Sequence, residues 1–279
     1  MTINPVYRRE MKVSSRSIRL PIILAVFNFI LAAFALISMA TTVNMARETA
    51  QLDYAAFLQI FAFVAVIEFA LIIMVQPALT AGSISGERER RTLDLMLTTR
   101  LTPAKIVTGK LLTSLSNVVV VLASSLPILA MVFAYGGVTV MNIVVLMISF
   151  LTAALLTASI GLLASSFCKR SSMATALAYA GVLVLMGGTL GFCILGCNIM
   201  GSSGNAIYIL LANPASTFYC AVCAMLGYRS GVQDMASMLC TSTAMSITAW
   251  FILGTVIQLI LSLVFLLISV RNIGPDRKV

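Results

Sequence analysis

Long apolar segments constrain this chain more than any other feature of its sequence. Stretches of about 20 or more predominantly apolar residues recur from residue 20 to residue 270, and each could cross a bilayer as a helix. With 60% hydrophobic and 10% charged residues, a soluble domain of this composition would lack the polar side chains to cover its surface. The sequence therefore predicts an all-α polytopic membrane protein.

Six spans are predicted at residues 20–40, 54–80, 104–135, 140–167, 173–199 and 246–270, within a single transmembrane domain of residues 1–279. The first is too long and uninterrupted for a signal-peptide core and has no convincing small-residue cleavage site after it. Thr102 and Pro103 are typical of a helix start and place the beginning of the third span. Lys105 and Lys110 follow in its first two turns, from which we expect them to extend to the headgroups.

Residues 201–245 are the least regular part of the chain. The stretch from Ala206 to Leu226 is long enough to span, but Asn213 and Pro214 interrupt it in the middle and leave pieces that are too short. We predict an outer region of short helices or a re-entrant segment. The chain then has six spans with both termini on the cytoplasmic side.

The distribution of basic residues favours six spans. Under that topology 16 of the 18 Lys and Arg residues lie on the cytoplasmic side. A seventh span would move Arg271, Arg277 and Lys278 to the outer side, against the positive-inside rule. The same rule explains the net charge of +9 better than a nucleic-acid partner does, because the basic residues cluster at the ends of apolar segments.

Residues 1–19 are basic and weakly amphipathic. Asn4 can cap a helix, and Pro5 suits its first position. We expect an interfacial helix on an anionic leaflet of the lipid bilayer, with a disordered basic tail as the alternative.

Residues 85–100, SGERERRTLDLMLTTR, hold seven of the 27 charged residues (18 basic and 9 acidic) between two predicted spans. Glu87 and Arg91 are four apart in the favourable order, and Glu87 and Glu89 would lie in a first helical turn, where the dipole favours acids. The apolar residues share one face of such a helix: Leu93, Met96 and Leu97. This pattern predicts a short amphipathic helix, with a solvated loop that only fixes topology as the alternative.

The order of residues around this stretch resembles the permease subunits of type-2 ABC transporters. That family has a proline-terminated span followed by a coupling helix with an E-x-E-x-G-T-L-x-L-L-L-T-x-P-like pattern, and here Gln76–Pro77 ends a span before residues 81–110. The matching positions are Glu87, Glu89, Thr92, Leu93, Asp94, Leu95, Leu97, Thr98, Pro103 and Lys110. The six spans, the basic N-terminal helix and the broken outer segment are also similar. One position departs from the pattern, because Arg91 stands where the family usually has Gly.

This resemblance implies a permease subunit of an ATP-driven exporter, in which residues 85–100 form the coupling helix that docks in a groove of a cytoplasmic ATPase subunit. It also implies ATP and Mg on that ATPase, a second permease subunit that is identical or related, and a multi-pass location in the plasma membrane of a bacterium. The coupling surface would consist of Glu87, Arg88, Glu89, Arg90, Arg91, Thr92, Leu93, Asp94, Met96 and Leu97.

The chain lacks a phosphate-binding loop of its own. Such a loop needs Gly-x4-Gly-Lys-Ser/Thr, so that backbone amides cradle the phosphates. Residues 104–111 contain Gly109 and Lys110 but lack the first glycine and the hydroxyl, and they lie inside a predicted span. Histidine is absent, which excludes imidazole chemistry. We therefore expect no enzymatic activity, cofactor or metal on this chain.

Three polar residues lie inside predicted spans. Glu68 is the only acid well inside one, and such groups usually face a bundle interior or a water-filled path. It is a candidate for substrate or cation contact, with a structural hydrogen bond to a neighbouring span as the alternative. Gln258 and Asn28 admit the same two interpretations.

Cysteines and small residues leave further alternatives open. Cys220-x-x-Cys223 lies in an apolar stretch without His, so packing explains it better than zinc. Five of the six cysteines fall near the predicted outer half, which leaves one outer disulfide as an alternative. The runs Ala154-x3-Ala158, Thr157-x3-Gly161 and Gly187-x3-Gly191 allow close helix packing, either within the subunit or at a dimer seam.

Two functions from different classes compete. The first is the ABC exporter permease. The alternative is an ATP-independent secondary transporter or channel with Glu68 as its ion-coupling carboxylate, which predicts inverted repeats and several intramembrane breaks, whereas the chain has one clear break and no convincing repeat. A purely structural scaffold would leave Glu68 and the charged stretch unexplained. The spans do not define a substrate, because a drug, peptide, lipid, polysaccharide or cation would meet a mostly apolar interface.

Overall fold

The computed structural model describes residues 5–16, 18–49, 54–92, 102–134, 139–200, 205–228, 230–239 and 245–273. These ranges contain helices and no strand, which confirms the all-α prediction. The α-helices are α1 (Pro5–Arg16), α2 (Arg19–Thr49), α3 (Tyr54–Glu89), α5 (Pro103–Ala134), α6 (Val140–Phe167), α7 (Ser171–Leu183), α8 (Thr189–Met200), α9 (Pro214–Met225), α10 (Gly231–Met238) and α11 (Ile247–Ile273). A π-helical turn, η1 (Val184–Gly188), joins α7 to α8, and a 3₁₀ helix, η2 (Asn205–Ala212), precedes α9.

Six helical segments in the described part of the chain are long and apolar enough to cross a membrane, in agreement with the six predicted spans. They are Pro21–Thr41, Gln59–Glu89, Pro103–Pro127, Val140–Phe167, Ser171–Gly196 and Ile247–Ile273. The pair η2 and α9 would add a seventh only as a single span, and its two helices are bent by 89° relative to each other.

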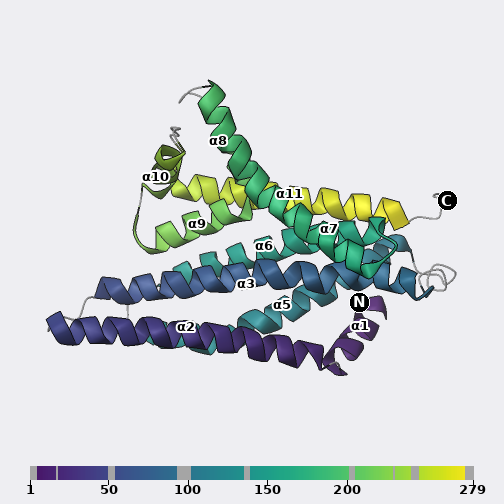
Figure 1. Cartoon of the computed structure of the whole chain (residues 1–279), viewed down its shortest axis with the longest axis horizontal. Coiled ribbons are helices and arrows are strands. Elements are labelled where there is room, and N and C mark those ends of the chain that lie inside the picture. The colour runs from purple at the N-terminus through teal and green to yellow at the C-terminus, as the bar shows by residue number, and fades with distance from the viewer. Residues whose placement is uncertain are drawn as a thin grey trace.

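The spans form two groups by burial. In an apolar stretch of 18 residues within each span, 61% of the residues are buried in α3, α5 and α6, against 11% in α2, 17% in α7–α8 and 22% in α11. Helices α3 and α6 pack together in the middle of the bundle, with α2 along one side and α11 along the other (Figure 1). The inner helices therefore form the core, and the outer ones present apolar faces away from it.

Helices α3 and α6 approach each other closely because α6 carries small residues. A Cβ atom built on Gly161 of α6 would lie 1.9 Å from Oγ1 of Thr80 in α3. One turn further, the Ser165 hydroxyl oxygen accepts hydrogen bonds from the backbone amides of Ile84 and Ser85, both at 2.9 Å. The Thr157-x3-Gly161 run thus packs within the subunit, as small residues allow.

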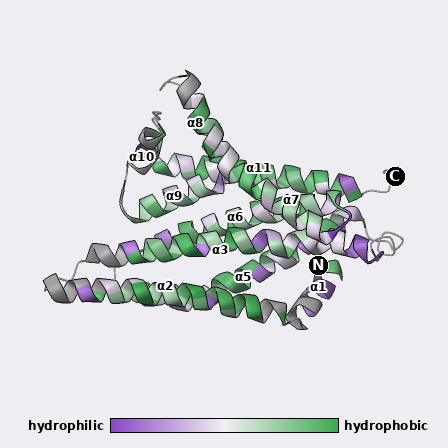
Figure 2. Cartoon of the chain, in the orientation of Figure 1, coloured by the Kyte–Doolittle hydropathy of each residue, from purple (hydrophilic) through white to green (hydrophobic). Residues whose placement is uncertain are grey.

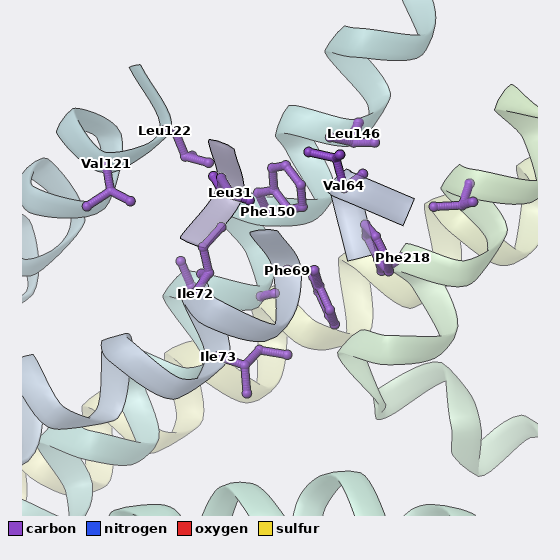
Figure 3. Close-up of a cluster of buried hydrophobic side chains, with 14 of the residues drawn as sticks. Leu31, Val64, Phe69, Ile72, Ile73, Val121, Leu122, Leu146, Phe150 and Phe218 are labelled. Carbon is purple, nitrogen blue, oxygen red and sulfur yellow. The ribbon is translucent and has the colours of Figure 1, made fainter. Parts of the chain in front are cut away.

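An aromatic stack joins α9 to this core (Figure 3). The ring of Phe218 in α9 lies 4.2 Å from that of Phe69 in α3 and 5.8 Å from that of Phe150 in α6, measured between centroids. Leu31 of α2 and Leu122 of α5 are buried in the same cluster. Such contacts bury large apolar areas, so α9 belongs to the main core and not to a separate layer.

Helix α3 continues through Pro77 to Glu89, which corrects two predicted boundaries. The sequence analysis ended the span at residue 80 and began a separate helix at residue 85. In the structure, Ser85 is fully buried, its hydroxyl donates to the Ala81 carbonyl at 3.0 Å, and its amide is held by Ser165 of α6. Packing against α6 keeps these residues in the helix of the span.

The described residues between 205 and 239 form short helices, which is one of the two arrangements that the sequence analysis left open. Helices η2 and α9 meet at Asn213, whose Oδ1 accepts a hydrogen bond from the Ala215 amide at 2.9 Å and so caps α9, with Pro214 as its first residue. Helix α10 follows. The fifth predicted span is interrupted by the π turn η1, which the sequence analysis did not anticipate.

Candidate functional site

Polar residues gather at one end of the bundle, where α1, the end of α3 and the end of α11 lie (Figure 2). Five charged residues of the described chain make the contacts that define this charged end: Glu10, Glu87, Arg88, Glu89 and Lys110. It includes the first part of the predicted coupling segment.

Lys110 of α5 binds two carboxylates from different helices. Its Nζ lies 3.0 Å from Oε1 of Glu87 at the end of α3 and 3.3 Å from Oε1 of Glu10 in α1, and its side chain is only 3% exposed. A buried ammonium needs such partners, because its desolvation is costly. Two expectations are therefore corrected: Lys110 does not extend to the headgroups, and Glu87 pairs with Lys110 instead of Arg91.

Helix α1 packs against α5 through the face that carries Glu10. Val6 is buried, and the Tyr7 hydroxyl lies 3.0 Å from Oγ of Ser116 in α5. Arg8 and Arg9 are exposed on the other side. The described part of α1 is thus amphipathic in its contacts, with one face against α5 and with Arg8 and Arg9 exposed.

Arg88 and Glu89 bind the ends of two neighbouring helices. Nη1 of Arg88 donates to the carbonyl oxygens of Ser166 and Cys168 at 3.1 and 3.2 Å, where α6 ends. Oε2 of Glu89 accepts from the amide and the hydroxyl of Ser171 at 3.2 and 2.9 Å, where α7 begins. A cation at a helix C-terminus and an anion at an N-terminus both complement the helix dipole.

The charged residues end a helix, whereas the sequence analysis placed them at the start of one. Glu87 and Glu89 lie in the last turn of α3. The Arg91 amide donates to the Arg88 carbonyl at 3.0 Å and the Thr92 amide to the Glu87 carbonyl at 2.9 Å, which is a Schellman motif. Arg91 has φ of 57° there, in the left-handed region that favours glycine. The family pattern has glycine at the position of Arg91, and glycine would adopt this backbone conformation without strain.

The structure describes only part of the predicted coupling surface. Arg90 and Arg91 are exposed and Thr92 is half-buried, and its hydroxyl donates to the Glu87 carbonyl at 3.1 Å. The remaining four predicted residues lie outside the described residues: Leu93, Asp94, Met96 and Leu97. Sequence reasoning missed Glu10 and Ser171 as partners, because they lie 100 and 82 residues from the side chains they contact.

The polar residues within the spans each bond a neighbouring helix. The Ser125 hydroxyl of α5 donates to Oε1 of Glu68, which is fully buried in α3. Nδ2 of Asn28 in α2 donates to Oγ of Ser124 at 2.9 Å, one residue earlier in α5. Buried oxygens of Glu68 (Oε2) and Asn28 (Oδ1) have no hydrogen-bond partner.

Gln258 lies apart from this pair, at the bend between η2 and α9. Its Nε2 donates to Oγ1 of Thr217 at 3.0 Å and to the Asn213 carbonyl at 3.3 Å. The structure therefore brings Asn28 and Glu68 to adjacent positions of α5 and leaves Gln258 outside that group.

Four cysteine side chains are described, and all are buried and outside any disulfide: Cys168, Cys193, Cys220 and Cys223. Cys197 and Cys240 have side chains outside the described set. Within the described residues, no group of three His, Cys, Asp or Glu side chains could hold a metal ion.

The fold and the charged end define a multi-pass helical membrane protein in which the ion pairs of the described residues lie at one end of the bundle. The family described as ABC-2 family transporter protein matches residues 34–271, so the chain belongs to the ABC-2 family of transporters. No curated protein matches the chain. Membership confirms the resemblance drawn from residues 76–110 and makes the chain a membrane permease of an ABC transporter, which works with an ABC ATPase subunit. Permeases of this family are typically non-catalytic transmembrane subunits.

Proposed function

We propose that the chain is the permease subunit of an ATP-driven exporter and that residues 85–100 transmit the ATPase cycle to the spans. One observation carries the proposal. Lys110, Arg88 and Glu89 tie the end of α3 to α1, α5, α6 and α7 through the contacts described above. A partner that moves the segment after α3 would therefore displace several spans together, as a lever requires.

The partner is a cytoplasmic ATPase that binds ATP and Mg, since this chain lacks a phosphate-binding loop. Two permease subunits, identical or related, would enclose the substrate path, and the weakly buried α2, α7–α8 and α11 offer apolar faces for that contact or for lipid. The complex would lie in the plasma membrane of a bacterium with both termini of the chain in the cytoplasm.

The test is to purify the chain from its native membrane, to identify any ABC ATPase that co-purifies with it, and to measure ATP hydrolysis. Arg90→Glu reverses an exposed charge next to the coupling segment. It removes the favourable charge of Arg90 near Glu89 but keeps the side-chain hydrogen bonds and ion pairs of Arg88, Glu89 and Lys110. We expect the ATPase to co-purify with the wild-type chain, and Arg90→Glu to lower the stimulated hydrolysis severalfold while thermal stability stays unchanged.

Arg271→Glu is the matched control, because Arg271 is exposed in the last turn of α11, on another element. It should leave hydrolysis near the wild-type rate. If no ATPase co-purifies with the wild-type chain, or if both variants have the same effect, the proposed coupling is wrong.

Ion coupling by Glu68 remains a second candidate, and its unpartnered Oε2 in a buried position favours it. Proteoliposomes that contain the chain alone and a pH-sensitive dye separate the two candidates. If Glu68 couples ion movement, the wild-type chain dissipates an imposed proton gradient and the Glu68→Gln variant does not. Equal behaviour of both chains would make Glu68 a structural hydrogen-bonding residue.

A further inference from the structure

The π turn η1 is bonded directly to the bend of the outer region. Nδ2 of Asn213 donates to the Met186 carbonyl at 3.0 Å, inside the turn, and to Oγ1 of Thr189 at 2.9 Å, just after it. π turns are rare in proteins and often coincide with functional sites. A side chain at the corner between η2 and α9 therefore holds the one irregular turn of the fifth span.

Asn213 also links this turn to the sixth span. Its carbonyl accepts a hydrogen bond from Gln258, and both residues are 1% exposed. Gly254, one turn before Gln258, makes room for the corner, since a Cβ built there would lie 2.2 Å from Cγ2 of Thr217. The corner is thus fixed between the fifth span on one side, through the Asn213 side chain, and α11 on the other, through the Asn213 carbonyl and the Thr217 hydroxyl.

We propose that η1 is a two-state element, held in its π form by Asn213, and that its conversion to regular α-helix moves α8 relative to η2 and α9. A π turn holds an extra residue, so its conversion rotates the following helix by about 100°, the angle of one residue in an α-helix. This switch belongs to the permease chain alone and does not depend on the proposed ATPase coupling.

Cys193 is a native reporter of the switch. It lies in α8, is fully buried, and packs in one cluster with Ile207 and Leu210 of η2. Rotation of α8 carries its thiol out of that contact, where an alkylating reagent can reach it.

The test is alkylation by N-ethylmaleimide of the full-length chain in lipid nanodiscs, with each cysteine quantified by mass spectrometry. Asn213→Ser keeps an oxygen that can cap α9 but lacks the amide group that reaches Met186 and Thr189. We expect roughly tenfold faster labelling of Cys193, because two hydrogen bonds between helices are lost. Thr189→Val removes one of them and should accelerate labelling about threefold.

Two controls separate the switch from loss of fold. Cys168 is buried at the charged end and should stay protected in every variant. Thr175→Val in α7 matches Thr189→Val, because the Thr175 hydroxyl donates only within its own helix, to the Ser172 carbonyl at 2.8 Å, and it should label like the wild type. Unchanged Cys193 labelling in Asn213→Ser, or equal acceleration at Cys168, would overturn the proposal.

Deletion of Gly187 tests the two-state turn itself. Gly187 has no side chain, and a Cβ there would meet nothing within 4 Å, so its deletion removes no side-chain contact. Without the extra residue the turn has no π form to convert. Asn213→Ser is then expected to leave Cys193 protected in the deletion background, and continued fast labelling there would show that η1 is not the switch.

Discussion

At the scale of single residues, the side chains of the charged end already have binding partners within the same chain. Glu87 and Glu89 match the family pattern, yet one binds Lys110 and the other binds Ser171. A charge reversal at either site would break these internal contacts as well as any ATPase contact. Arg90 is exposed on the same turn, so it reports on a partner more directly.

The backbone conformation of Arg91 predicts whether a substitution raises or lowers the free energy of unfolding. It has φ of 57° at the end of α3, and Gly227 has φ of 78° at the equivalent position after α9. Because a side chain in the left-handed region costs about 1 kcal/mol, Arg91→Gly should raise the free energy of unfolding by up to about that amount. Gly227→Ala should lower it by a similar amount. Thermal unfolding in detergent measures the change for both variants. A lower unfolding midpoint for Arg91→Gly than for the wild type would contradict the prediction that Arg91 is strained.

Lys110 is the residue whose loss should be most damaging at the charged end. Lys110→Met leaves the carboxylates of Glu87 and Glu10 without their cation, and we expect a loss of about 3 kcal/mol in the free energy of unfolding. Lys105→Met on the same helix, where the side chain is exposed, should cost much less.

The double variant Lys110→Met with Glu87→Gln should recover part of that loss, because it removes one unpaired charge. Denaturant titration of the wild-type chain, Lys110→Met, Glu87→Gln and the double variant measures these differences. An additive double variant would show that the ion pair with Glu87 contributes little.

At the scale of elements, the packing of α3 on α6 depends on one small residue. Gly161→Ala places a Cβ 1.9 Å from Oγ1 and 2.9 Å from Cβ of Thr80, so the helices must separate, at a cost of about 2 kcal/mol. Gly82→Ala is the matched control, since a Cβ there meets nothing within 4 Å, and it should stabilise the helix by about 0.5–1 kcal/mol. Equal unfolding midpoints for the two variants would contradict this picture.

The helices were predictable from the sequence where the length of an apolar segment is sufficient to define a span. The fourth span was predicted at 140–167, and α6 occupies Val140–Phe167. The end of α3 was not predictable, because Ser85 has no local signal for helix and stays in it through contacts with Ser165 of α6. The π turn was missed for the same reason, since the hydrogen bond that holds it comes from Asn213, 27 residues after Met186.

At the scale of the whole molecule, the six spans predict which residues share a side of the membrane. Single cysteines at Arg90, Arg271 and Tyr228 can be labelled with a membrane-impermeant maleimide in vesicles of known orientation, with the wild-type chain as the baseline. Arg90→Cys and Arg271→Cys should react from the cytoplasmic side and Tyr228→Cys from the outer side. If η2 and α9 formed a seventh span, Arg90→Cys and Arg271→Cys would react from opposite sides.

The sequence by itself determined the membrane class, the number of spans, the break at Asn213 and Pro214, and the family, because these depend on apolar length, local turn chemistry and a short motif. The tertiary structure alone decided the partners of the charged residues: Glu87 and Glu10 meet on Lys110, and Glu89 meets the start of α7. These contacts join residues 23, 100 and 82 positions apart. No local pattern encodes such pairs, because the packing of whole helices brings their ends together.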